Sequence, residues 1–133
     1  MKNTSYNEIW KTFLNNCKVS DIDLPQTDEQ RYEAIRNAVL HFNNRLREDV
    51  KCDDSTETVD RKLSDDHLLI LAHYIRLIFL INQKTFYESL FQPFSQDVGI
   101  RNYNTQMNSL QKSIERQEEL IEKLILNMAV DFL

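Results

Sequence analysis

Residues Ser64 to Phe91 read SDDHLLILAHYIRLIFLINQKTFYESLF, and neither glycine nor proline interrupts them. Ser64 is a favourable helix N-cap, and the two aspartates that follow it place negative charge at the positive end of a helix dipole. From residue 68 to residue 81 nearly every side chain is aliphatic or aromatic. A helix that is apolar on almost all sides must be buried. We therefore expect a long central helix around which the rest of the chain packs.

The apolar run does not predict a membrane span. A spanning helix needs about 20 consecutive apolar residues, whereas this run covers only residues 68–81 and contains Arg76. We expect the central helix to be buried in protein, and no membrane among the partners.

Composition indicates an all-α protein. The chain of 133 residues contains a single glycine and two prolines, so it has little material for tight β-turns. Its hydrophobic content of 41% and charged content of 28% are ordinary for a globular domain. We expect one helical domain over residues 1–133, a bundle of about four helices around the central apolar helix, with a long C-terminal helix.

Two shorter helices are predicted before the central one. Ser5 and Thr27 each stand three residues before Glu8 or Gln30, which is the capping-box spacing at a helix start. We expect these helices to end near residues 17 and 49. The second helix has a core-facing stripe at steps of three and four residues. Its members are Tyr32, Ile35, Val39, Phe42 and Leu46.

The last predicted helix begins near Asn104 and carries a stripe at heptad spacing. Its members are Met107, Leu110, Ile114, Gln117, Ile121 and Leu124. Gln117 is the single polar residue among them. Such a stripe suits packing on the chain's own bundle or on another subunit, and the sequence leaves both open.

Two groups of apolar residues are candidates for contact with a partner protein. The first comprises Met107, Leu110 and Ile114 of the last helix. The second lies in the apolar tail of residues 128–133 and comprises Val130, Phe132 and Leu133. An apolar chain end gains stability only where it docks on a surface.

Acidic residues are concentrated between the second helix and the central one. Residues 48–60 carry a net charge of −5, which equals the net charge of the whole chain. The remaining residues form no basic stripe that could neutralise phosphates, so sequence-independent binding of nucleic acid is not expected. We expect residues 48–63 to form an acidic, solvated loop.

No pattern of catalytic or metal-binding residues is present. The three histidines lack metal-ligand spacing, and His73 is expected to have a structural, at least partly buried role. One glycine is too few for a phosphate-binding loop. Cys17 and Cys52 are expected to be free thiols. We therefore expect no enzyme activity, no metal and no cofactor.

Several stretches resemble the head–tail connector proteins of tailed bacteriophages, small helical adaptors that bind beneath the portal. Residues 69–76, LILAHYIR, are similar to their hallmark helix, in which an aliphatic run leads into small, aromatic and then basic residues. Shorter similarities are NEIW at residues 7–10, IRNAV at residues 35–39 and HFNNRL at residues 41–46.

This resemblance implies a structural virion protein in the phage neck, made in the cytoplasm of a bacterial host. Its partners would be copies of itself in a ring, commonly a dodecamer, together with the portal and with tail or neck proteins. The ring would extend the DNA channel, and DNA would pass without specific binding. In such rings negative charge faces the channel, which would place Asp53, Asp54 and Glu57 there.

The last helix is longer and more heptad-like than a minimal adaptor requires. An alternative function is therefore a small helical regulator that binds another protein, or a coiled-coil assembly factor, acting as a dimer.

Overall fold

The computed structural model of the chain describes residues 2–17, 24–25, 27–91 and 100–130, without the side chains of residues 90, 91, 100–103, 129 and 130. The all-α class predicted from the sequence is confirmed. The helices of the described part are α1 (Tyr6–Asn16), α2 (Asp28–Leu46), α3 (Asp65–Phe91) and α4 (Ile100–Val130). Between α2 and α3 lie two short strands, β1 (Cys52–Asp53) and β2 (Thr58–Val59).

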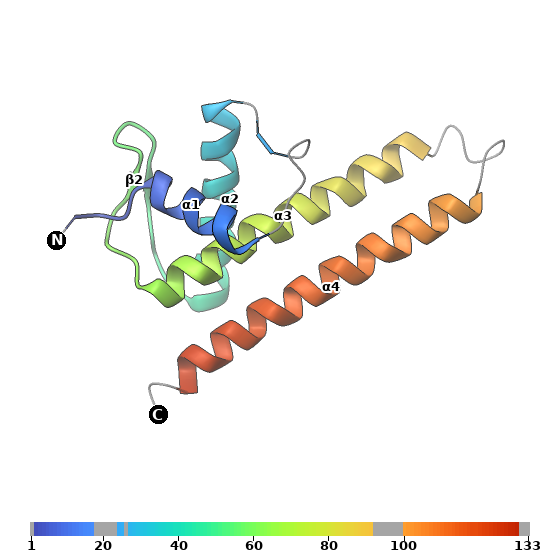
Figure 1. The fold of residues 1–133 in the computed structure, drawn as a ribbon. Helices are drawn as coiled ribbons and strands as arrows, with labels where there is room; N and C mark the ends of the chain where they lie inside the picture. Colours follow the sequence, from blue (N-terminus) through green and yellow to red (C-terminus); the bar gives the residue numbers. More distant parts are fainter. Residues whose placement is uncertain (1, 18–23, 26, 92–99, 131–133) are drawn as a thin grey trace.

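Helix α3 is the central element, as expected. The Ser64 hydroxyl caps its start by accepting a hydrogen bond from the backbone N–H of His67, at 3.1 Å. Helices α1 and α2 gather around the N-terminal part of α3, and its C-terminal part projects beyond them beside α4 (Figure 1). Leu71 and Ile75 are fully buried in the core.

Two further residues that the apolar run places in the core, Ile78 and Phe79, are only partly buried. They line a cavity of about 420 Å³ that also includes Leu24 and Pro25. The cavity leaves one side of both residues open, which periodicity along a single helix does not reveal.

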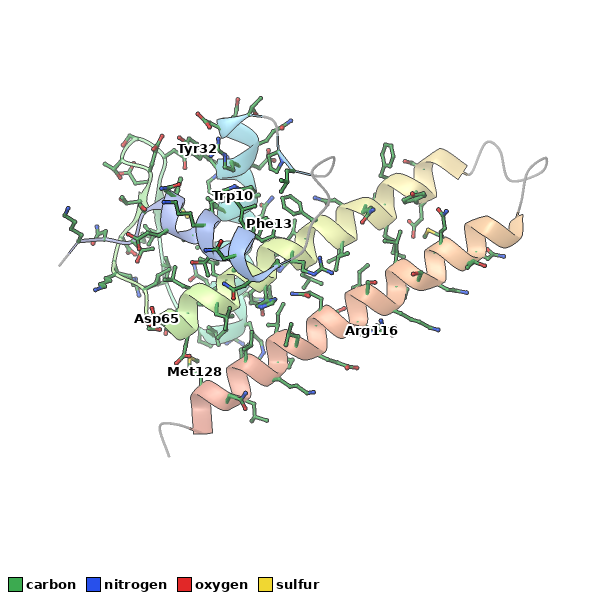
Figure 2. All side chains as sticks on the ribbon, in the orientation of Figure 1. Trp10, Phe13, Tyr32, Asp65, Arg116 and Met128 are labelled. Carbon is green, nitrogen blue, oxygen red and sulfur yellow. The ribbon has the colours of Figure 1, made fainter. Side chains whose placement is uncertain are left out.

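Aromatic side chains fasten α1 to α3. Trp10 and Phe13 project from α1 toward α3 (Figure 2). Their rings meet Phe79, with centroids 6.4 Å and 5.5 Å away in edge-on arrangements. Edge-on aromatic pairs contribute beyond simple burial, by about 0.5–1.5 kcal/mol each.

Local signals placed most helix starts correctly. The Ser5 and Thr27 side chains accept hydrogen bonds from the N–H groups of Glu8 and Gln30, so both predicted N-caps are confirmed. The predicted end of α2 is three residues too late. Arg47 adopts a left-handed conformation with φ of 57°, which terminates the helix at Leu46.

The predicted acidic loop is wrong in one respect, because residues 52–59 form an antiparallel β-hairpin. Cys52 pairs with Val59, and Asp53 pairs with Thr58. Thr58 also forms an isolated antiparallel β-bridge with Ser5, in the segment before α1, so this segment lies beside the hairpin. Strands of two residues are too short for the alternation by which a sequence reveals them.

Helix α4 lies antiparallel to α3 along most of its length (Figure 1). It begins at Ile100, four residues earlier than predicted. Its heptad stripe packs on the chain's own bundle, which was one of the two possibilities left open by the sequence. The fully buried members are Ile114, Gln117 and Ile121, joined by Ile125.

Candidate interaction surface

An apolar groove of about 1050 Å³ lies where α2, α3 and α4 meet. Its apolar lining consists of Tyr74, Leu77, Ile81, Ile121, Ile125 and Leu126. Leu126 is 62% exposed and Ile81 is 42% exposed. Single exposed apolar residues are common, but a group that shares one groove marks a candidate docking site.

Charged residues of both signs surround this apolar groove. Glu118, Glu119 and Glu122 of α4 lie on its rim with Lys123, and Arg45 of α2 faces them. Arg45 donates two hydrogen bonds to the carboxylate of Glu122, at 2.9 and 2.6 Å. These bonds hold the pKa of Glu122 below its ordinary value. A charged rim around an apolar floor is the usual anatomy of a protein–protein interface.

A buried polar cluster, made of Cys17, His73, Arg76 and Gln117, joins three helices. The amide nitrogen of Gln117 lies 2.9 Å from Nδ1 of His73 and 3.0 Å from its carbonyl oxygen. The side-chain oxygen of Gln117 accepts a hydrogen bond from Nε of Arg76, at 3.2 Å. The Cys17 sulfur, at the end of α1, lies 3.7 Å from Nδ1 of His73.

A cysteine sulfur beside an imidazole nitrogen is the geometry of a thiol–imidazole nucleophile, but the electrostatics of this cluster do not fit one. Burial raises the pKa of Cys17 to about 11. Burial, and secondarily the positive charge of Arg76, lowers the pKa of His73. Both groups are therefore neutral near pH 7, whereas a nucleophilic cysteine requires a stabilised thiolate. The predicted burial of His73 is confirmed, since it is 8% exposed.

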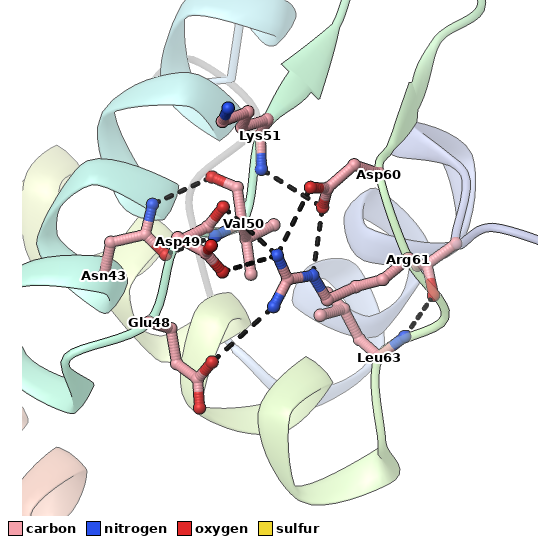
Figure 3. A network of polar contacts seen from close by, with 9 residues as sticks. Asn43, Glu48, Asp49, Val50, Lys51, Asp60, Arg61 and Leu63 are labelled. Carbon is pink, nitrogen blue, oxygen red and sulfur yellow. Dashed lines mark hydrogen bonds and ion pairs between the residues drawn. The ribbon is translucent and has the colours of Figure 1, made fainter.

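The acidic residues around the hairpin are held by intramolecular contacts rather than solvated separately. Arg61 lies at the centre and forms ion pairs with Glu48, Asp49 and Asp60, at 3.6, 2.6 and 3.0 Å (Figure 3). Beside them, the Asn43 side chain accepts a hydrogen bond from the N–H of Val50, at 3.0 Å, and donates one to the carbonyl oxygen of Val50, at 2.9 Å. The end of α2 is thereby fastened to the strand that follows.

The three acids expected to face a channel are exposed, and each also has a partner within the chain. Asp54 accepts a hydrogen bond of 2.6 Å from the Tyr6 hydroxyl and pairs with Arg36. Glu57 accepts a hydrogen bond from the hydroxyl of Tyr32 on α2. Asp53 accepts hydrogen bonds from the N–H and hydroxyl of the serine two residues on. The contacts of Asp54 and Glu57 fix the hairpin to α1 and α2, and those of Asp53 lie within the hairpin, roles that the sequence did not predict.

Of the six residues predicted to contact a partner, the three with described side chains lie on α4. Ile114 is 5% exposed and therefore covered by the chain's own packing, which corrects its assignment as a partner contact. Met107 and Leu110 are half-buried on the same helix. Val130 ends α4 without a described side chain, and Phe132 and Leu133 lie outside the described residues.

The groove residues were missed because apolar residues were assigned to the core by default. One signal was available in the sequence. Ile125 and Leu126 are adjacent on a helix, where neighbouring positions point about 100° apart, so both cannot face one partner helix. One of the two must point away from the buried face of α4, and it is Leu126, since Ile125 is only 7% exposed.

The described residues show neither a metal-binding cluster nor a membrane-spanning helix. No group of three or more His, Cys, Asp or Glu side chains there is arranged to hold a metal ion. None of the helices, as described, combines the length and the apolar character that crossing a membrane requires.

Residues 1–130 match the YomZ prophage protein family. The chain belongs to this family. A relative is the SPbeta prophage-derived uncharacterized protein YomZ of Bacillus subtilis (strain 168), which is 62% identical over 130 residues, covering 98% of this chain and 99% of the relative. No solved structure matches the chain. The phage origin implied by the resemblance to connector proteins is thus supported, and the family description itself carries no connector role.

Proposed function

We propose that this protein is a structural component of a phage particle, a head–tail connector that assembles with copies of itself through the apolar groove. The observation that carries the proposal is the exposed apolar floor at Ile81 and Leu126 within a rim of charges. Membership of a prophage family supports a phage role. A fold made almost entirely of helices agrees with a small adaptor.

A ring requires that the groove of one copy receives a different surface of the next copy, because such head-to-tail contacts close by rotation. Helix α1 offers a suitable surface and lines no part of the groove. Leu14 on α1 is 45% exposed, and Lys11 is exposed one turn earlier. Leu14 would fill the apolar floor, and Lys11 would face the glutamates on the rim.

The remaining assignments complete the proposal. The ring, a dodecamer in this proposal, lies in the neck of the virion between the portal and the tail proteins, after synthesis in the host cytoplasm. Asp53, Asp54 and Glu57 lie toward the channel, so that DNA passes without binding. Phe132 and Leu133 attach each copy to the portal, and many copies strengthen a weak single contact through avidity.

The test of assembly is native mass spectrometry of the purified protein and of two matched variants. Leu126→Asp places a charge in the groove. Leu120→Asp makes the same change on the same helix, at a residue that is 38% exposed and does not line the groove. We expect a closed ring for the wild type and for Leu120→Asp, and monomers with an unchanged thermal melt for Leu126→Asp.

Other outcomes would contradict the proposal. Rings formed equally well by Leu126→Asp would show that the groove is not the interface. A stable dimer of the wild type would favour the alternative, a regulator or a coiled-coil assembly factor. The portal contact is tested separately by deleting residues 131–133 and measuring cosedimentation with portal-bearing phage heads. Binding equal to that of the full chain would remove Phe132 and Leu133 from the attachment.

A further inference from the structure

Gln117 occupies a heptad position in the α3–α4 interface where every other fully buried stripe residue is isoleucine. It is 5% exposed. We propose that Gln117 and His73 form a register pin that fixes α4 at one position along α3. A register pin is a buried polar pair that is satisfied in only one alignment of two helices.

Apolar contacts alone specify this alignment weakly. A slide of α4 by one heptad, about 10.5 Å, replaces one apolar stripe residue by another. Such a slide brings Leu110 or Leu124 to the level that Gln117 occupies. The apolar area that is removed from water changes little, so the two alignments differ little in hydrophobic free energy.

The polar contacts make the two alignments unequal. In the observed alignment both amide hydrogens of Gln117 and its oxygen are used, by His73 and Arg76. After a slide the buried amide would lose these partners, and a buried polar group without a hydrogen-bond partner destabilises the fold. A single buried polar residue at a heptad position is known to set register at some cost in stability.

The register pin requires one protonation state of the His73 imidazole. The amide nitrogen of Gln117 can only donate, so Nδ1 of His73 must be an unprotonated acceptor, with its proton on Nε2. The Cys17 thiol donates to the carbonyl oxygen of Ala72, with the sulfur 3.8 Å away. This contact brings the end of α1 to the same level of α3, so three helices are aligned at one point.

The register of α4 decides whether the apolar groove exists. Leu126 and Glu122 would both move with α4, and the ion pair between Arg45 and Glu122 would separate. The further expectation that a slide would abolish assembly rests on the proposed function. The inference that the pin sets the register is independent of the proposed function.

The test uses the full chain with Gln117→Met, which keeps the length of the side chain but removes the amide. Ile114→Met is the matched control at another buried position of the same stripe. Two measurements are made on each protein: the thermal melt, and the number of backbone amide signals per residue of α3 and α4 in a ¹H–¹⁵N correlation spectrum.

We expect Gln117→Met to melt at the wild-type temperature or above it, and to give two or more sets of signals for α3 and α4. Ile114→Met and the wild type should each give one set. A single set for Gln117→Met would show that register is fixed without the pin. Outright unfolding of Gln117→Met would show that the amide supplies stability rather than register, and would equally overturn the inference. Neither result depends on ring formation, which the groove variants test.

Discussion

Arg45 on α2 and Glu122 on α4 are joined by two hydrogen bonds, although 77 residues of sequence separate them. The contact is notable because α2 and α4 each pack mainly on α3 rather than on one another. Both side chains are about half exposed, at 46% and 54%. Water and salt therefore screen their attraction, and the pair positions the rim of the groove more than it stabilises the fold.

The first prediction is a small coupling energy for this pair. A double-mutant cycle with Arg45→Ala and Glu122→Ala, measured by urea unfolding, should give about 0.2–1 kcal/mol. The matched cycle of Arg45 with Glu118, on the same rim, should give a coupling near zero. A coupling well above 1 kcal/mol for Arg45 and Glu122 would mean that the pair is far better shielded from water than its exposure indicates.

The second prediction concerns pH. In the folded chain the pKa of His73 lies below the ordinary 6.5, chiefly through burial and also through the charge of Arg76. The groups that face it from other helices, Cys17 and Gln117, carry no charge near neutral pH. Below about pH 6.5 the unfolded chain therefore binds a proton that the folded chain resists. The contribution of His73 therefore leaves the free energy of unfolding undiminished above that pH, and lowers it as the pH falls toward the folded-state pKa.

The measurement is the free energy of unfolding in urea at pH 7.5 and at pH 5.5. His73→Gln should remove part of the decrease between these two values, because no imidazole remains at that site. His41→Gln, an exposed control, should keep the wild-type decrease. An equal decrease in the free energy of unfolding between pH 7.5 and pH 5.5 for all three proteins would show that His73 does not contribute to the pH dependence.

The third prediction concerns the core. Leu71→Ala and Ile75→Ala each remove a fully buried side chain from α3 and should each lower the free energy of unfolding by about 2–5 kcal/mol. Leu40→Ala, at a residue that is 66% exposed, should change it by less than about 0.5 kcal/mol. Chemical denaturation compares the three variants. A core variant no less stable than Leu40→Ala would contradict the central position of α3.

The fourth prediction tests the junction between the N-terminal segment and the hairpin. The Thr4 hydroxyl, on a residue that is 1% exposed, accepts a hydrogen bond of 2.8 Å from the backbone N–H of Leu63. Thr4→Val keeps the shape but leaves that buried N–H without its acceptor. We expect a loss of about 1–3 kcal/mol in the free energy of unfolding. Thr4→Ser, which keeps the hydroxyl, should lose less, and equal losses would assign the effect to packing.

The features that the sequence predicted are those with local causes. The apolar run places α3, and the side chains of Ser5, Thr27 and Ser64 cap the three helix starts that they were expected to cap. The heptad stripe correctly gives α4 a buried face. Each of these signals depends on residues within a few positions of one another, so the rest of the chain cannot easily override it.

The features that were missed depend on distant partners. The hairpin turns through Glu57, which has a positive φ of 54° without being a glycine. Its support comes from a tyrosine of α2, 25 residues away. Gln117 was recognised as the polar break in its stripe, but its partner His73 lies 44 residues earlier in the sequence. The groove is likewise formed only when three helices meet, so no single segment could predict it.

The last prediction concerns the charges around Arg61. This guanidinium contacts three carboxylates, of Glu48, Asp49 and Asp60, so its removal leaves several negative charges close together. Arg61→Met should therefore lower stability by about 1 kcal/mol at low salt, and added salt should reduce the loss by screening the repulsion. Lys62→Met removes the same charge from the next residue and should leave the melting temperature nearly unchanged.

A calcium titration tests whether the carboxylates around Arg61 form a structural network or a cation-binding site. In the wild type these carboxylates already contact the guanidinium of Arg61. Residues 48–60 have neither the glycine nor the alternating oxygen ligands of an EF-hand loop. Calorimetric titration of the wild type should therefore show no saturable heat at micromolar calcium. Saturable binding by the wild type would reassign the hairpin as a cation site. Equal melting temperatures for Arg61→Met and Lys62→Met would show that the network contributes nothing to stability.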